Sequence, residues 1–282
     1  MIPNIRNLIA SDIDQIEPVL MAAYSEPNSF KSELRRYLIL QPDGWLVAES
    51  DNTLVGMVGA VDYGAFAYIG MMAVDPAFQR QGIGRRLIGH LLGWLDGRGC
   101  PLMLLDATEM GAKLYTKLGF IEDEPTLVFE QLDYPKSLCS YKCVSQLCAA
   151  ELSELTIFDA QIFGAERQAV FATFLAEIPK RAFLARNVAG QITGYLFAQA
   201  STLGPWAAST PEVAEALLAT ALNLSFSDKL QVFVPGFNKA ATSLLMRYGF
   251  SKKRVQHHLR RGDSASPGQR FMLYGLASLS IG

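Results

Sequence analysis

The two halves of this chain carry the same series of segments, and this internal repeat limits the possible folds more than any other feature. A segment with a helical pattern ends at Gly119-Phe120 in the first half, and residues 238–250 repeat that pattern in the second. Before each of them come two apolar runs joined by a polar turn, at residues 44–60 and 181–198. Such self-similarity indicates two copies of one fold. The 282 residues are enough for two domains of ordinary size.

The first half also contains a strand, a glycine-rich turn and a helix in direct succession. Residues 69–74 are apolar and predict a strand, Asp75-Pro76 predicts a turn, and a helix is predicted over residues 83–95. Between them, Gln79, Gly82 and Gly84 follow the spacing Gln-x-x-Gly-x-Gly. Because glycine has no side chain, the backbone can approach a ligand there. The unpaired N–H groups at the helix start, with the positive end of its dipole, favour a phosphate in this turn.

Other phosphate-binding motifs do not fit this turn. No Gly-Lys-Ser/Thr follows, which excludes a Walker loop, and Leu87 stands where a dinucleotide fingerprint has its third glycine. Taken alone, the spacing favours a tight strand-to-helix turn without a ligand. The segments that follow decide between the two interpretations. Residues 102–106 predict a buried strand, residues 108–118 predict a helix that Gly119 ends, and Phe120 starts another strand.

Together these two motifs resemble the GNAT acyltransferases. That family has a Gln/Arg-x-x-Gly-x-Gly/Ala loop that grips the pyrophosphate of acetyl-CoA. Its later segment reads Asn-x-x-Ala-x-x-Leu-Tyr-x-x-x-Gly-Phe, of which this chain keeps Leu114, Tyr115 and Gly119-Phe120. It departs from the segment at Thr108 and Gly111.

The resemblance implies acetyl-CoA as co-substrate. In the family, a splay beside the central strand lets backbone groups hydrogen-bond the pantetheine arm. The expected cofactor-binding residues are Met72, Ala73, Val74, Gln79, Arg80, Gln81, Gly82, Ile83, Gly84, Arg85, Thr108, Gly111 and Tyr115.

The second half repeats the plan without its cofactor loop. Gly56 and Gly119 lie 63 residues apart, whereas Gly194 and Gly249 lie 55 apart. At the corresponding helix start, Thr210 is a predicted N-cap and Pro211 the first helical residue, and Glu212 would repel a phosphate. Leu245 also replaces the tyrosine of the first half. We therefore expect a degenerate second copy and one CoA per chain.

The predicted fold is of mixed α/β class, with two tandem GNAT-like domains that each have a mixed sheet flanked by helices. The domains are expected at residues 1–135, which would bind acetyl-CoA and catalyse, and 140–282. Further helices are predicted over residues 11–21 and 29–38, with Pro18 as a point where the first can kink or break.

Transfer of an acetyl group from a thioester to an amine needs an acid for the leaving thiolate but no covalent intermediate. By resemblance, Tyr115 is that acid, and without the motif it would be read as a core tyrosine. The general base is not identified by the sequence. Its candidates are Asp62, Asp106 and Glu109. His90 is read as a helix residue, and His257-His258 is expected away from the sulfur.

The predicted function is N-acetylation of a primary amine on a small molecule. The alternatives are a CoA-binding sensor without turnover, and a protein acetylase that acts on lysine or an N-terminus. The expected pocket-lining residues are Tyr24, Asn28, Phe30 and Trp45 from the first half and Trp206 and Phe237 from the second, with aromatic core as the competing interpretation. Acceptor, acyl length and oligomeric state stay open.

Composition excludes several other classes. The chain has 25 basic and 27 acidic residues and no basic run mixed with aromatics, which argues against a nucleic-acid partner. Residues 1–6 lack the pattern of a signal peptide, and no apolar segment approaches the ~20 residues of a membrane span, so a cytoplasmic location is expected. The four cysteines lack zinc-site spacing and are expected to be reduced and packed as small apolar groups, so no metal is predicted.

Overall fold

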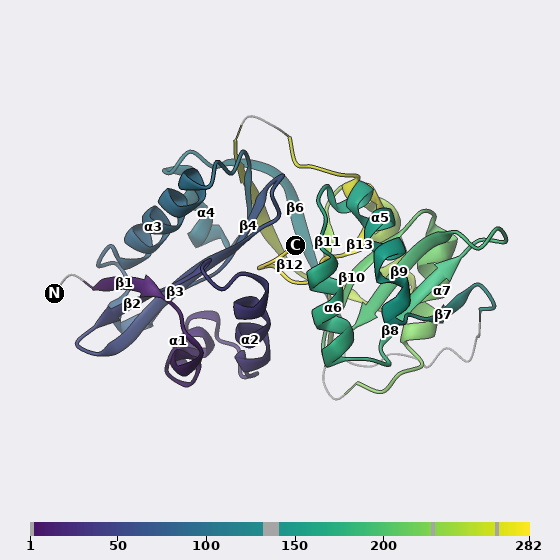
Figure 1. The fold of residues 1–282 in the computed structure, drawn as a ribbon, viewed down its shortest axis with the longest axis horizontal. Helices are drawn as coiled ribbons and strands as arrows, with labels where there is room; N and C mark the ends of the chain where they lie inside the picture. Colours follow the sequence, from purple (N-terminus) through teal and green to yellow (C-terminus); the bar gives the residue numbers. More distant parts are fainter. Residues whose placement is uncertain (1–2, 132–140, 227–228, 263–264) are drawn as a thin grey trace. The chain divides into compact units, whose positions relative to one another are not determined.

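The computed structural model describes residues 3–131, 141–226, 229–262 and 265–282. Their contacts form two compact units. Figure 1 shows the helices and strands of the chain. The first unit holds the residues up to Leu105, with short pieces around 261–262 and 281, and the second holds most of the rest. The predicted boundary between residues 135 and 140 lies outside the described residues, so the predicted domain extents stay a prediction.

The first unit contains the early elements of the described chain, and the last of them, β5, runs on into the second unit. They are β1 (Asn4–Asn7), α1 (Ile13–Tyr24), α2 (Lys31–Leu40), β2 (Trp45–Ser50), β3 (Thr53–Asp62), β4 (Ala67–Val74), α3 (Ile83–Gly97) and β5 (Met103–Ala107). The strand order is β1-β2-β3-β4-β5, and only the β4–β5 pair is parallel. Helices α1 and α2 lie on one face of this sheet and α3 on the other (Figure 1). The predicted class of mixed sheets flanked by helices is confirmed.

Local sequence explains most of these elements. The β2–β3 hairpin turns at Asp51 and Asn52, whose φ angles of 50° and 59° are tolerated by Asp and Asn. Helix α1 continues through Pro18 instead of breaking there. Proline removes one backbone hydrogen bond, but the buried side chains of this helix hold it against the sheet.

The second unit contains the later segments of the chain. They are α4 (Glu109–Thr116), β6 (Ile121–Gln131), β7 (Val144–Gln146), α5 (Leu152–Phe163), α6 (Gln168–Glu177), β8 (Ala182–Arg186), β9 (Ile192–Ala198), β10 (Leu203–Ala208), α7 (Pro211–Ala221), β11 (Leu230–Pro235), α8 (Lys239–Arg247), β12 (Ser251–Arg261) and β13 (Leu273–Gly275). One sheet has the order β13-β10-β9-β8-β7, and β6 lies between β12 and β11. None of the described helices is long and apolar enough to cross a membrane.

The element order confirms the repeat, since β7 to β12 follow the same sequence of strands and helices as β1 to β6. The equivalent strands β6 and β12 pair with each other, antiparallel. Ser251 pairs with Glu130, and their counterparts Ile121 and Arg260 pair in the same way. This symmetric register is that of an isologous contact. Both neighbours of β6 therefore come from the second half of the sequence.

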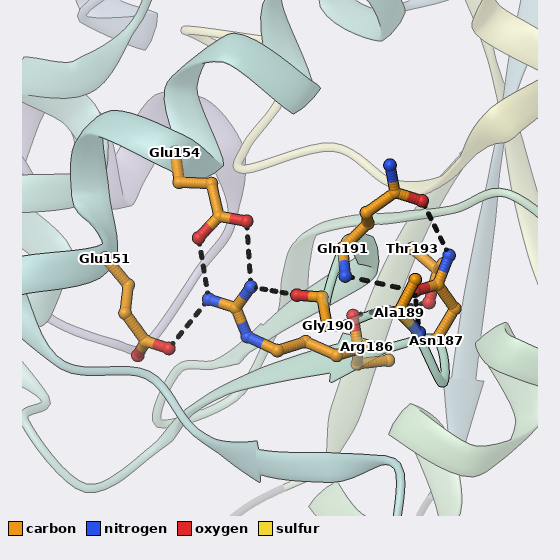
Figure 2. A network of polar contacts seen from close by, with 9 residues as sticks. Glu151, Glu154, Arg186, Asn187, Ala189, Gly190, Gln191 and Thr193 are labelled. Atoms are coloured by element: carbon orange, nitrogen blue, oxygen red, sulfur yellow. Dashed lines mark hydrogen bonds and ion pairs between the residues drawn. The ribbon is translucent and has the colours of Figure 1, made fainter.

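In each half, an arginine on a strand forms ion pairs with acidic residues at or near the start of the following helix. The arginine lies on the first strand of the first half and on the second strand of the second half. In the first half, Arg6 on β1 contacts Glu49 on β2 and Asp12 at the entry to α1, both at 2.7 Å. In the second half, Arg186 takes the place of the β2 glutamate and pairs with Glu151 at 3.0 Å and Glu154 at 2.8 Å (Figure 2). The carboxylates raise the pKa of both arginines above the usual value.

A buried ion pair lies under the sheet of the second unit. Arg167 donates to Asp159 at 2.8 Å, both side chains are 1% exposed, and Tyr195 donates to the same carboxylate. In Arg167→Met, Asp159 loses its buried cation, and we expect the free energy of unfolding to fall by about 3–5 kcal/mol. Urea denaturation measures this change. Arg247→Met is the matched control, because its pair with Glu215 is exposed and worth at most about 1 kcal/mol. Equal small losses in both variants would contradict the prediction.

The cysteines differ from the expectation. Cys143 and Cys148 are exposed, so they are not packed as core groups, and Cys100 is partly buried. Burial raises the pKa of the Cys100 thiol. Cys139 lies outside the described residues. In the described part of the chain, no group of three His, Cys, Asp or Glu side chains is arranged to hold a metal ion.

Candidate active site

Strand β4 has a bulge and an open edge in the middle of the first unit. Met71 has a φ of 55°, and at this point the pairing with β3 shifts register between Met57 and Gly59. On the other side, β4 pairs with β5 from Ala67 to Ile69. Within the described residues, β4 makes no strand pairing to β5 beyond Ile69, so Met72 and Ala73 face an open edge. Backbone groups at such an edge can accept a ligand that carries amides.

The predicted phosphate turn follows directly after this strand. Gly82 has a φ of 83° and precedes α3 without a side-chain cap, and the first intrahelical bond joins the N–H of Arg86 to Gly82 O at 3.1 Å. The N–H groups of Ile83, Gly84 and Arg85 precede that bond, so they are left for another acceptor. Gln79 braces the turn, since its Nε2 donates to Val74 O at 3.0 Å.

The charge around this helix start suits an anion. Helix α3 has no acidic residue in its first turn. Arg80 and Arg85 are exposed there, and Nη1 of Arg86 is buried without a hydrogen-bond partner among the described residues. A buried donor of this kind usually has water or a ligand as its partner. The second half differs, because Thr210 caps α7 with a bond from Val213 N at 3.4 Å and Glu212 lies in the first turn.

Helix α4 carries the remaining predicted cofactor residues, in the second unit. Thr108 caps it by accepting from Gly111 N at 3.2 Å. Tyr115 is 5% exposed, and its ring packs against Phe120 at 5.6 Å between centroids. Burial raises the pKa of Tyr115 well above its usual value, so the phenol stays protonated at neutral pH.

The candidate base Glu109 contacts a histidine of β12. Glu109, at the start of α4, accepts from His257 at 2.9 Å. His257 was expected away from the sulfur site, but it contacts the helix that carries Tyr115, because β12 pairs with β6 next to it. Glu122 and then Glu109 raise the pKa of His257 above its usual value. Local sequence patterns do not indicate this contact, because Glu109 and His257 are 148 positions apart.

The other two candidate bases have structural partners. Asp106 ends β5 with a fully buried side chain, accepts from Thr126 at 2.6 Å and lies 3.2 Å from His258 Nδ1. Asp62 pairs with Arg98 at 2.8 Å. His90 is exposed on α3, as a solvated helix residue would be.

Of the residues expected to line an acceptor pocket, some are exposed at the surface and others are buried in the core. Tyr24 is exposed, packs near Phe30, and donates its hydroxyl to Met72 O on the open strand at 3.1 Å. Asn28 is exposed and bonds Glu26. Trp45 is completely buried and stacks on Tyr37 at 4.8 Å, so its assignment to a pocket is wrong.

Trp45 fits into the core because Gly59 leaves room for its ring. In the second half, Trp206 is also completely buried, whereas Phe237 is 62% exposed.

Comparisons with known proteins match both halves. The model of the acetyltransferase (GNAT) family matches residues 11–120, and that of an acetyltransferase (GNAT) domain matches residues 155–275. The chain belongs to the GNAT superfamily of acetyltransferases. Two GNAT domains in tandem confirm the predicted family and architecture.

Individual GNAT proteins are similar over different lengths. An uncharacterized N-acetyltransferase of Bacillus subtilis, YitH, is 27% identical over 241 residues and covers 81% of each chain. The crystal structure of a putative acetyltransferase from Pyrococcus horikoshii has a TM-score of 0.87 at 27% identity, covering 99% of this chain and 96% of that one. A ribosomal protein bS18-alanine N-acetyltransferase of Escherichia coli is 44% identical over 54 residues, which are 18% of this chain and 36% of that protein.

GNAT enzymes use acetyl-CoA, and the Gly84 position gives a direct test of whether the start of α3 is a CoA site in this chain. In Gly84→Glu, a side chain and a negative charge enter the helix start, and we expect CoA affinity to fall by at least about 100-fold while the helix stays folded, since Glu suits a first turn. Isothermal titration calorimetry measures the affinity. Gly89→Glu is the control, because it adds the same charge to the same helix in open space. Unchanged affinity in a folded Gly84→Glu protein would place the phosphates elsewhere.

Proposed function

We propose that this chain transfers an acetyl group from acetyl-CoA directly to a primary amine of a small molecule. The observation that carries this proposal is the combination of an open edge on β4 and an uncapped, non-acidic start of α3. A pantetheine arm offers amides to the first, and a pyrophosphate offers anionic oxygens to the second. Two adjacent features that suit the two parts of one molecule favour CoA over a simple anion.

In this proposal the open strand and the turn hold the co-substrate. Met72, Ala73 and Val74 pair with the pantetheine arm through their backbone. The turn binds the pyrophosphate with the backbone N–H groups of Gln81, Gly82, Ile83, Gly84 and Arg85, supported by Gln79 and Arg80. Thr108, Gly111 and Tyr115 complete the set from α4. Residues 1–135 form the acetyl-CoA-binding domain and residues 140–282 the degenerate one, so one CoA binds per chain.

Tyr115 is the proposed acid for the leaving thiolate. The thiolate of CoA must gain a proton as the carbon–sulfur bond breaks, and the amine nitrogen forms the new bond to the acetyl carbon. A protonated phenol can supply that proton or a hydrogen bond. Burial keeps the Tyr115 hydroxyl protonated by raising its pKa, so it is available to donate a hydrogen bond to the leaving sulfur. Because a thiol is a stronger acid than a phenol, this hydrogen bond is the contribution that the raised pKa favours.

Two alternatives remain. A protein acceptor is favoured by the similarity to the bS18-alanine N-acetyltransferase, a protein whose name gives a ribosomal protein as its target. A CoA-binding sensor is favoured by the partners of the candidate bases Asp62 and Asp106, which tie both to structural contacts.

One screen separates these functions. Thiol release from acetyl-CoA is measured with amines, amino acids, polyamines and short peptides that have a free N-terminal alanine or an internal lysine. Turnover with a small amine supports the proposal, and turnover with peptides alone transfers it to protein acetylation. CoA binding without release in any assay would favour the sensor.

A further inference from the structure

The second half contains a strand equivalent to β4, but the edge that is open on β4 is paired in this half. Strand β10 corresponds to β4, because Gly194 pairs with Ala208 as Gly56 pairs with Val74. Both strands also shift register in the stretch just before this pair, between Leu203 and Trp206 in β10 and between Gly70 and Ala73 in β4. Trp206 and Ala207 are therefore the counterparts of Met72 and Ala73.

In the second half, strand β13 occupies the side of β10 that is open on β4. Strands β10 and β11 begin side by side, linked by a parallel bridge between Thr202 and Gln231. Beyond this bridge, β13 pairs antiparallel with Trp206 and Ala207. On its other side, Leu276 N donates to Phe233 O of β11 at 2.9 Å. The chain thus runs an extra strand into the gap between β10 and β11.

This strand is anchored by side chains as well as by its backbone. Nδ2 of Asn238, the N-cap of α8, donates to Leu273 O at 2.8 Å. The ring of Tyr274 lies 5.2 Å from that of Trp206, and Tyr274 is 2% exposed. Gly275 fits where a Cβ would come within 2.5 Å of Leu203 O. These contacts make β13 a fixed part of the core.

We propose that Leu273–Gly275 is a built-in occupant of the second half's acyl-CoA slot, a peptide strand in place of a pantetheine arm. A peptide offers the same alternation of N–H and C=O groups that the amides of pantetheine offer to β4. The capped, acidic start of α7 then has no phosphate to bind. Loss of the cofactor loop and gain of β13 are one change, which converts a ligand-binding domain into a closed structural one. This inference rests on the proposed function, in which β4 binds the pantetheine arm of CoA.

Hydrogen exchange on the intact wild-type chain, with and without saturating CoA, tests this occupancy. We expect the peptide that contains residues 203–208 to be protected without CoA and unchanged by it, because β13 already covers it. The peptide that contains residues 70–75 should gain protection only when CoA is added. Fast exchange at residues 203–208 without CoA, or new protection there with CoA, would overturn the proposal that β13 occupies this slot. Absence of any CoA effect at residues 70–75 would instead count against the proposed function and leave the test of residues 203–208 intact.

A pair of variants adds a second readout. Tyr274→Ala removes an anchor of β13, and exchange at residues 203–208 should then speed up by at least about tenfold. Phe271→Ala is the control, because Phe271 is 60% exposed just before β13. If both variants exchange like the wild type, β13 is not held by the contacts described above.

Discussion

Residues 1–135 expressed alone are expected not to fold, whereas the same residues expressed together with residues 136–282 should form a one-to-one complex. The reason is the position of β6, which pairs with β11 on one edge and with β12 on the other. Without the second half, both edges of an eleven-residue strand become unpaired and its buried side chains, including Val128 and Phe129, enter water. Exposing each such side chain costs about 1.5–3 kcal/mol, and the total approaches the 5–15 kcal/mol by which a typical protein is stable.

Size-exclusion chromatography and circular dichroism of the separate and coexpressed fragments measure this dependence. The control is the intact chain with a protease site between residues 135 and 140, left uncut, which shows whether the insertion itself does harm. After cleavage we expect the fragments to elute together. A soluble fragment of residues 1–135 that unfolds cooperatively on its own would contradict the expectation.

Tyr115→Phe is expected to lower kcat by about 10²- to 10⁴-fold while acetyl-CoA affinity changes little. A general acid acts mainly in the transition state, so its loss appears in kcat more than in binding. The change keeps the ring that packs against Phe120, which protects the fold. Steady-state kinetics with the best amine of the screen, together with calorimetric binding of acetyl-CoA, separates the two effects.

Tyr274→Phe is the matched control for this experiment. Tyr274 is also a buried tyrosine, and burial raises its pKa to about 12, but it lies outside the sequence motif of Tyr115. Removal of the Tyr274 hydroxyl in this variant should leave kcat unchanged within a factor of about 2–3. If the two variants behave alike, Tyr115 is a packing residue.

Local patterns predicted much of this molecule. The hairpin at Asp51-Asn52, the helix that begins after Gly82 and the cap at Thr210 depend on residues close together in the chain, and each occurs where the sequence indicated. The family follows from two such motifs in the right order. Whether Tyr115 and the cofactor residues act as proposed stays a prediction.

Long-range pairing could not be predicted in the same way. Nothing in β6 says whether its partner strands come from its own half or from the other, because antiparallel pairing needs only alternating side chains. The three residues of β13 are too few to show a period, and their role follows from where they lie. For Trp45 the sequence left a pocket and a core as open alternatives, because an aromatic side chain suits both equally well. The space left by Gly59 decides for the core, and this space depends on an adjacent strand.

The two arginine clusters have a consequence for how the halves of the gene can evolve. Arg6 and Arg186 balance acids at equivalent places, but from different strands. A gene-conversion tract that copied β2 onto β8 would place a glutamate beside Glu151 and Glu154, and one that copied β1 onto β7 would place a second arginine beside Arg186. Like charges so placed are destabilising. Exchange between the two copies is therefore penalised, and each half is left to diverge on its own.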